Sequence, residues 1–308
     1  MKQVTVIGSG VMGHGIAQLV AQANVPVVLT DVYESSLEKA TELITANLAM
    51  QVEQQAISES EKERTLMTLS TSTDVIQSAS NSDLVIEAIS EKLDLKHELY
   101  EKLEEAILKE TIIASNTSTF SLEALTKNVA HPERFIVTHF FNPAQFVPLV
   151  EVVKGNKTTE DVAKRVMNFM EQVGKRPILL QKDVPGFIAN RLQAALVREA
   201  FHLLEEGVAD ARSIDLAVTE GPGLRWGFSG PLETADFGGL DIWKSVVENL
   251  APELSAKQQV PSFIDAAIEN GNLGTKTSKG IYSYSDEVIQ SRLVERDEYL
   301  LKMSKVRQ

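Results

Sequence analysis

Apolar residues in the first half of the chain fall into short runs, separated by longer stretches with helical periodicity. The runs are rich in β-branched residues and have the length of buried strands. They cover residues 4–7, 26–30, 84–88, 111–114, 135–139, 149–153 and 177–181. Helical patterns lie between many of them, and this alternation predicts a parallel, doubly wound α/β sheet.

The pattern changes at residues 182–186, Lys-Asp-Val-Pro-Gly, where proline and glycine interrupt the chain. Beyond this point β-branched runs nearly vanish, and residues 188–206 place leucines and alanines at helical spacing. We therefore expect a sheet domain in residues 1–183 and an all-helical domain in residues 184–308. The helical stripe is most often core packing. A two-fold subunit interface is the alternative, and a homodimer is expected.

The composition is that of a soluble globular protein, with 43% hydrophobic and 24% charged residues in a chain of 308. A formal net charge of -13 disfavours binding to nucleic acid and to anionic lipid surfaces. No apolar stretch approaches the length of a membrane span, and a strand pattern rather than a signal peptide begins at Val4. We expect a cytoplasmic protein that acts on a small molecule.

The cysteine and histidine content limits the available chemistry. The chain has no cysteine, which excludes disulfides, thiolate nucleophiles and cysteine-ligated metals. The five histidines show no ligand spacing on one helix, so no metal is expected.

A glycine motif follows the first strand and opens a helix. Gly8, Gly10 and Gly13 have the GxGxxG spacing, in which the glycines allow a tight turn, a close approach to a pyrophosphate and close helix packing. The second strand ends at Asp31, where a carboxylate accepts hydrogen bonds from ribose hydroxyls. No arginine follows in residues 32–34, so a Rossmann-type domain that binds NAD rather than NADP is favoured. The motif alone does not separate NAD from FAD, and an ordinary glycine turn with a capping aspartate is the alternative.

His139 and Glu151 are the candidates for acid-base chemistry. Glu151 interrupts the apolar run of residues 149–153, and a buried charge there needs a partner. If the two strands fold back about Gln145, the two residues are equidistant from the turn and face each other. A histidine oriented by a carboxylate suits removal of an alcohol's hydroxyl proton. A buried pair that only satisfies itself is the alternative.

A turn rich in hydroxyl groups, from Asn116 to Thr119, follows the strand that ends at Ala114. Such turns usually cap helices, and Ser121 or Thr119 is well placed to do so. The functional alternative is that one hydroxyl contacts the substrate, because open α/β sheets bind ligands at this edge.

Together these stretches resemble the 3-hydroxyacyl-CoA dehydrogenase family over nearly the whole chain. The matching pieces are the glycine motif with Asp31, VIEAISEKLDLKHELY, ASNTST, HFFNP with LVEVV, KDVPGFIANRL, GPLETADFGGLD and GTKTSKGIYSY. Seven pieces in the family's order make a highly specific match. The resemblance implies an NAD-binding domain, a helical dimerisation domain and a place in fatty acid metabolism.

The resemblance also implies roles for individual residues. His139 would be the general base and acid, with Glu151 as its orienting partner. Ser118 would hydrogen-bond the reacting oxygen, and Asn190 would complete the substrate site. The residues expected near the nicotinamide half of the cofactor are Glu91, Lys96, Ser118 and Asn142. Without the resemblance, Lys96 would be interpreted as a solvated helix charge and Asn190 as a polar residue at a helix end.

Two departures from the family pattern concern the substrate. Many acyl-CoA members have several lysines after the second strand, whereas residues 42–64 contain none before Lys62. The segment GPGLRWGFSGPLETADF is similar to relatives that oxidise gulonate or carnitine. Arg225 and Trp226 in it suit a carboxylate or a quaternary ammonium, although a packed Arg-Trp pair is equally compatible. The charged tail after Tyr284 extends past the shorter members and predicts a surface helix.

We therefore expect an NAD-dependent oxidoreductase that reversibly converts a short-chain L-3-hydroxyacyl-CoA to the 3-ketoacyl-CoA. In the oxidative direction His139 takes the hydroxyl proton and NAD accepts the hydride. One alternative keeps this reaction but replaces the substrate by a free hydroxy acid, L-gulonate-like or carnitine-like. The other is a non-catalytic NAD-binding structural protein.

Overall fold

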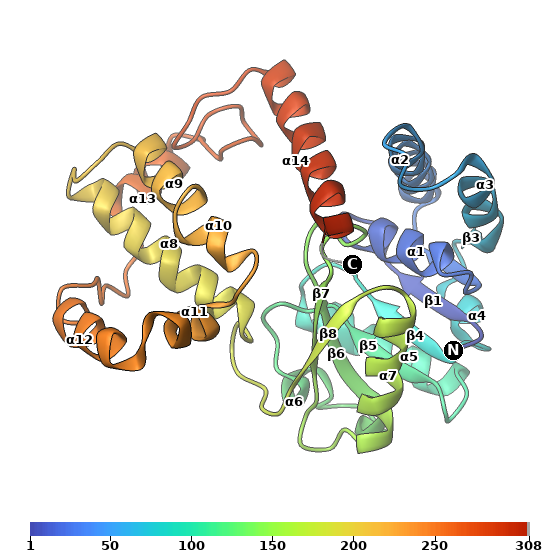
Figure 1. The fold of residues 1–308 in the computed structure, drawn as a ribbon. Coiled ribbons are helices and arrows are strands. Elements are labelled where there is room, and N and C mark those ends of the chain that lie inside the picture. Colours follow the sequence, from blue (N-terminus) through green and yellow to red (C-terminus); the bar gives the residue numbers. More distant parts are fainter. Residues whose placement is uncertain (307–308) are drawn as a thin grey trace. The chain divides into compact units, whose positions relative to one another are not determined.

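The computed structural model describes residues 1–306 and consists of two compact units (Figure 1). The first unit comprises Met1–Ile188 together with the end of the chain from Val294, and the second comprises Ala189–Leu293. The sequence prediction put the boundary slightly earlier, after residue 183, and the whole tail in the second domain. In the structure the end of the tail belongs to the first unit.

An eight-stranded sheet forms the centre of the first unit, with the strand order β3-β2-β1-β4-β5-β6-β7-β8. The strands are β1 (Val4–Ile7), β2 (Val27–Thr30), β3 (Leu69–Ser72), β4 (Leu84–Glu87), β5 (Ile112–Ser115), β6 (Phe135–Phe140), β7 (Leu149–Val153) and β8 (Arg176–Leu180). Neighbouring strands are parallel except for β6 and β7, which are antiparallel. This sheet and the helical second unit confirm the predicted fold class, a Rossmann-type α/β domain followed by a helical domain. The antiparallel β6–β7 pair departs from the parallel order that the sequence predicted.

The sequence pattern did not predict β3. Its residues, Leu-Ser-Thr-Ser, include one apolar side chain, and each is at least partly exposed. The strand lies at the edge of the sheet, beside β2. An edge strand pairs on one side and needs little apolar surface, so hydrophobic periodicity does not detect it.

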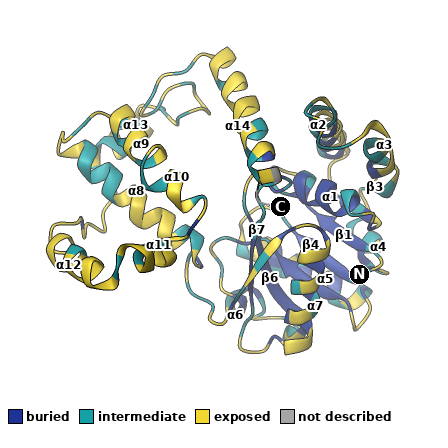
Figure 2. Ribbon diagram, viewed as in Figure 1, coloured by how far each residue is buried: buried dark blue, intermediate teal, exposed yellow. Residues whose placement is uncertain are grey.

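Two hydrophobic clusters cover the faces of this sheet. Successive side chains of a strand point to opposite faces, and β1 follows this rule because Val4 and Val6 join one cluster while Ile7 joins the other. The first cluster includes side chains of α1 (Gly13–Gln22), α2 (Glu34–Glu53) and α7 (Glu160–Gln172), and the second those of α4 (Val75–Ala79), α5 (Leu93–Ala106) and α6 (Leu122–Leu125). Figure 2 shows the resulting buried sheet. Helix α3 (Glu59–Thr68) begins with a capping box between Ser58 and Glu61.

The second unit consists of helices joined by loops. They are α8 (Ala189–Glu205), α9 (Ala211–Thr219), α10 (Pro222–Trp226), α11 (Pro231–Gly238), α12 (Leu240–Leu250), α13 (Ser262–Glu269) and the start of α14 (Asp286–Val306). None of the residues in α8 to α13 is buried within this chain (Figure 2). Leu192 and Leu196 of α8 belong to the stripe predicted as core, yet both are exposed. Among residues 1–306, no helix is both long and apolar enough to cross a membrane.

Candidate active site

The glycine motif forms the loop between β1 and α1. Gly8 has a positive φ of 97°, and a Cβ on it would lie 2.6 Å from the carbonyl oxygen of Ala88. A Cβ on Gly13 would lie 1.7 Å from the carbonyl oxygen of Gly8. At Gly10 a Cβ would have no neighbour within 4 Å, because this residue borders an open cavity. Gly8 and Gly13 are thus required by packing, while Gly10 leaves space for a ligand against the backbone.

Asp31 follows β2 and is held at the rim of the same cavity. Its Oδ2 accepts hydrogen bonds from the backbone nitrogen and the hydroxyl of Ser9, both at 2.9 Å. Its Oδ1 accepts a bond from the backbone nitrogen of Tyr33 at 3.2 Å. These bonds fix a carboxylate where an adenosine ribose is expected.

The main cavity has a volume of about 1360 Å³ and lies entirely within the first unit. It extends from the glycine loop to the end of β6 and exceeds the roughly 300–1,000 Å³ of ordinary small-ligand sites. The residues that line it and were predicted from the sequence are Gly8, Gly10, Asp31, Glu91, Ser118, His139 and Asn142. The space therefore fits a ligand as long as a dinucleotide, reaching from Asp31 to His139.

His139 and Glu151 face each other across the antiparallel strands β6 and β7. They are directly paired in the register, and the His139 Nδ1 lies 2.8 Å from the Glu151 Oε2. His139 is 6% exposed and Glu151 is fully buried. The second oxygen of Glu151 accepts a hydrogen bond from the backbone nitrogen of Ile188 at 2.9 Å. The carboxylate thus favours the tautomer with the proton on Nδ1, which leaves Nε2 as the proton acceptor.

Aromatic rings surround the imidazole of His139. Phe141 packs edge-on, with a ring-centroid distance of 4.5 Å, and Phe187 lies at 5.3 Å. Both rings exclude water from the His139–Glu151 pair. Excluding water strengthens the attraction between an imidazolium and the carboxylate.

A second buried carboxylate, Glu87, lies at the end of β4. It accepts hydrogen bonds from Lys96 Nζ at 2.6 Å, the Tyr100 hydroxyl at 2.7 Å and the Ser115 hydroxyl at 2.6 Å. The backbone nitrogen of Ile89 donates a fourth at 2.8 Å. Burial, and then the charge of Glu87, raises the pKa of Tyr100 well above its usual value. Tyr100 is therefore a permanent hydrogen-bond donor in this network.

Lys96 connects this network to Glu91 at the cavity wall. Its ammonium lies 3.1 Å from a Glu91 oxygen, while the other oxygen accepts bonds from the hydroxyl of Thr117 and the backbone nitrogen of Ser118. Burial alone would raise the pKa of Glu91, but the Thr117 hydroxyl and the Lys96 charge outweigh it and lower that pKa. Lys96 is fully buried and is not among the residues that line the cavity. Lys96 is therefore not a solvated helix charge, and its side chain does not form part of the cavity wall. Its link to the expected cofactor position is its ion pair with Glu91.

The sequence analysis missed Glu87, although a signal was present. Glu87 ends the apolar run Leu-Val-Ile-Glu-Ala, which resembles the run that contains Glu151. Asn116 was noted only as part of a turn, but its Oδ1 accepts a bond from the Phe140 backbone nitrogen at 2.9 Å and so fixes the strand end beside His139. Asn190 is the second residue of α8, at the start of the second unit.

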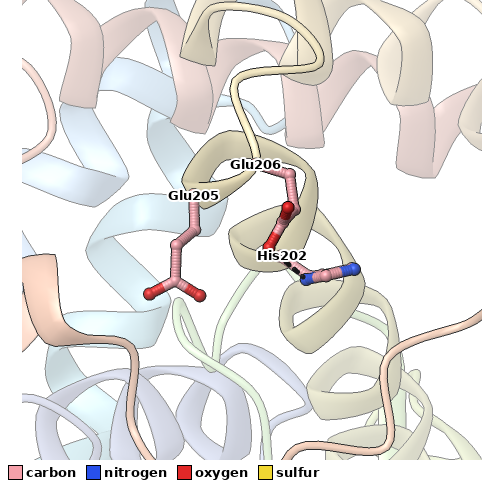
Figure 3. A group of neighbouring side chains, drawn as sticks. All are labelled: His202, Glu205 and Glu206. Atoms are coloured by element: carbon pink, nitrogen blue, oxygen red, sulfur yellow. Dashed lines mark ion pairs between the residues drawn. The ribbon is translucent and has the colours of Figure 1, made fainter.

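His202, Glu205 and Glu206, at the C-terminal end of α8, are close enough together to hold a metal ion (Figure 3). Glu205 is already paired with Lys257 at 2.7 Å, and His202 Nδ1 lies 3.9 Å from Glu206. All three come from one helix end and two are exposed. We assign no metal to this group, because a solvated cluster of charges explains it.

Comparison with known proteins identifies the family to which the chain belongs. The model of the 3-hydroxyacyl-CoA dehydrogenase NAD-binding domain matches residues 3–184, and that of the C-terminal domain matches residues 186–284. The human mitochondrial hydroxyacyl-coenzyme A dehydrogenase is 38% identical over 92% of this chain and 91% of its own length.

Another relative matches from end to end. The 5-formyl-3-hydroxy-2-methylpyridine 4-carboxylate 5-dehydrogenase of Mesorhizobium japonicum is 30% identical over 99% of this chain and 98% of its own. A crystal structure of the enzyme of that name, described as an NAD+-dependent dismutase, has a TM-score of 0.93 over 99% and 98% of the two chains. The (S)-3-hydroxybutyryl-CoA dehydrogenase of Ralstonia eutropha, 33% identical, has a TM-score of 0.75 over 93% and 100%. With both domain models matched, the chain belongs to the 3-hydroxyacyl-CoA dehydrogenase family, and its sheet domain binds NAD.

Proposed function

We propose that the protein catalyses the reversible, NAD-dependent oxidation of a short-chain L-3-hydroxyacyl-CoA to the 3-ketoacyl-CoA. The observation that carries this proposal is the His139–Glu151 pair, whose histidine lines the same cavity as the glycine loop and Asp31. A base and a cofactor cradle in one space are what removal of a proton and a hydride from one alcohol requires.

His139 performs the proton step. Its Nε2 accepts the hydroxyl proton as the C3–H bond breaks, and the bound NAD supplies the acceptor for the hydride. Glu151 keeps the proton on Nδ1 and stabilises the imidazolium with its negative charge, 2.8 Å away. In the reverse direction the same imidazolium returns its proton to the new alcohol oxygen.

Ser118, Asn142 and Asn190 complete the proposed site. Ser118 and Asn142 line the main cavity with His139, where a hydroxyl and an amide can hydrogen-bond the substrate oxygen or the cofactor amide. Glu91 holds the backbone nitrogen of Ser118 at 3.1 Å and so positions that turn. Asn190 is proposed as a substrate contact from the family resemblance.

A second candidate function is oxidation of a free carboxylated substrate. The end-to-end match favours it, because the crystal structure of the 5-formyl-3-hydroxy-2-methylpyridine 4-carboxylic acid 5-dehydrogenase, whose name gives a pyridine carboxylate, has a higher TM-score than the 3-hydroxybutyryl-CoA dehydrogenase structure. The lysine-poor stretch before Lys62 also lacks the charges that would neutralise CoA phosphates. In this case the exposed Arg225 on α10 is the candidate carboxylate ligand.

The test is NADH oxidation with acetoacetyl-CoA, run beside free acetoacetate, 3-dehydrocarnitine, a 3-keto sugar acid and 5-formyl-3-hydroxy-2-methylpyridine 4-carboxylate. We expect the highest kcat/KM with the thioester. Preference for a free acid would replace the first candidate by the second. No turnover of any of them, with intact NADH binding, would favour a non-catalytic NAD-binding protein.

The homodimer and the cytoplasmic location are further proposals. Exposed apolar side chains on α8 and α12, including Leu192, Leu196 and Trp243, support burial against a second copy. Sedimentation of the full chain tests this, and a monomer at micromolar concentration would contradict it.

A further inference from the structure

A second cavity is lined in part by the turn that joins the strands β6 and β7, which carry His139 and Glu151. It has a volume of about 430 Å³ and belongs to the first unit. The side chains that matter here are those of Gln22, Gln51, Gln145, Lys175, Arg176 and Leu301. They come from α1, α2, the turn, the start of β8 and the end of α14. We call it the Lys175 cavity.

Lys175 is a buried cation that forms no ion pair with a carboxylate in the described part of the chain. It is 5% exposed, and its Nζ donates to the carbonyl oxygens of Ala144 at 2.5 Å and Val147 at 2.7 Å. The described residues that line the cavity include no aspartate or glutamate. Burial lowers the pKa of Lys175 from 10.5 to about 7. Two carbonyl dipoles stabilise an ammonium less than a full negative charge does.

A chain of amide side chains ends in the same cavity. Asn47 donates to Gln18 at 3.3 Å, Gln18 donates to Gln22 at 3.3 Å, and Gln22 donates to the Oε1 of Gln51 at 3.0 Å. Gln51 is 5% exposed, and its Nε2 has no hydrogen-bond partner among the residues that the structure describes. Hydrogen bonds in such a chain polarise one another, so the final N–H group is a strong donor that lacks an acceptor.

We propose that the Lys175 cavity binds a small oxyanion, such as a carboxylate, which supplies the missing acceptor for Gln51 and the missing counter-charge for Lys175. One ligand chemistry satisfies both needs. Among the described residues, the charged side chains that line the cavity are Lys175 and Arg176, in a protein whose net charge is -13. The volume suits a small organic acid or a phosphate rather than a nucleotide.

Occupancy of this site affects the catalytic pair through the turn. Lys175 holds Ala144 and Val147, which lie between His139 on β6 and Glu151 on β7. A bound anion keeps the ammonium charged and thereby strengthens both bonds to the turn. The site is separate from the main cavity and does not depend on the substrate proposed above.

The experiment is thermal unfolding of the full chain in saturating NADH, titrated with succinate or inorganic phosphate against sodium chloride of equal ionic strength. NADH fills the cofactor part of the main cavity, so that added anions cannot bind at the glycine loop, and the variants below separate the Lys175 cavity from the substrate position. We expect Tm to rise with the oxyanion and to saturate, as specific binding to the native state requires. The two anions distinguish a carboxylate from a phosphate ligand.

Two variants locate the effect. Gln51→Glu is nearly isosteric and places a negative charge in the cavity, so the concentration for half-saturation should increase at least about tenfold. Lys175→Met should lose the response, while Lys39→Met on the exposed face of α2 should keep it. If Lys175→Met does not fold, Gln51→Glu decides. The proposal fails if wild type shows no saturable rise, or if Gln51→Glu responds as wild type does.

Discussion

Two buried lysines in the sheet unit show how differently one fold treats the same charge. Lys96 has no exposed surface, and two carboxylates lie 2.6 and 3.1 Å from its ammonium. Lys175 is 5% exposed and contacts two backbone carbonyls. Lys96 belongs to a region beside the main cavity that also contains the His139–Glu151 pair. Lys96 and His139 each lie beside a carboxylate. The Lys175 ammonium, in contrast, donates to the carbonyl dipoles of Ala144 and Val147.

The difference follows from the cost of removing a charge from water. A buried ion loses several kcal/mol of hydration, and an opposite charge in good geometry recovers much of it. Removing one partner then leaves an uncompensated ion, which is strongly destabilising. Lys96 is thus tied to its surroundings, while Lys175 can change its protonation or bind a ligand without breaking an ion pair.

The largest effect is expected from His139→Gln, which breaks the catalytic pair. The amide cannot accept the hydroxyl proton, so kcat should fall by about 10²–10⁴-fold with little change in NADH affinity. Stopped-flow turnover and NADH fluorescence titration measure the two quantities. His131→Gln, on an exposed loop, is the matched control. Wild-type turnover in His139→Gln would remove His139 from the mechanism.

Lys96→Met tests the paired region directly. It leaves Glu87 fully buried and both carboxylates without their cation, so the free energy of unfolding should fall by about 3–5 kcal/mol. Urea denaturation gives this value, with the exposed Lys127→Met as control. About 1.4 kcal/mol corresponds to a tenfold change in the ratio of folded to unfolded protein. A loss below about 1 kcal/mol would therefore show that Lys96 is not needed to stabilise the two carboxylates.

Tyr100→Phe removes one hydrogen bond to Glu87 and keeps the ion pair. A bond to a charged acceptor contributes about 1.5–3 kcal/mol, so the loss should be smaller than that of Lys96→Met. The same urea measurement applies, with the exposed Tyr299→Phe as control. An equal loss in the Tyr100 and Lys96 variants would contradict the assignment of Lys96 as the main counter-charge.

The smallest effect, taken per pH unit, is a pH dependence that distinguishes Lys175. Its pKa is 10.5 unfolded and about 7 folded, so between these values the unfolded chain binds more protons and stability rises with pH. Below pH 7 both states are protonated, and this contribution is constant. Among the described residues, the other charged side chain that lines the cavity is that of Arg176.

Unfolding of wild type and Lys175→Met, in buffers without carboxylate or phosphate, isolates this term. The stability difference, wild type minus variant, should increase by at most about 1.4 kcal/mol per pH unit above pH 7. A difference that does not change between pH 7 and 10 would mean that Lys175 titrates normally.

Local pattern predicted much of the fold and part of the site. The apolar runs gave seven strands, and the equal spacing of His139 and Glu151 from Gln145 gave their pairing across a hairpin. The edge strand β3 was missed because its residues are polar and half exposed. Glu87 was missed although it lies in an apolar run, because the two hydroxyls and the ammonium that satisfy it come from α5 and β5.

The sequence by itself determined the glycine loop, the acid that ends β2 and the family, because these features depend on residues close together in the chain or on their order. Only the tertiary structure decided that Lys96 is buried between two carboxylates and that Lys175 is not. The Lys175 cavity brings together Gln22, Gln51, Gln145 and Leu301 from four distant segments. Such contacts depend on how helices pack on the sheet, and no local periodicity encodes whether a buried lysine meets a carboxylate or a carbonyl.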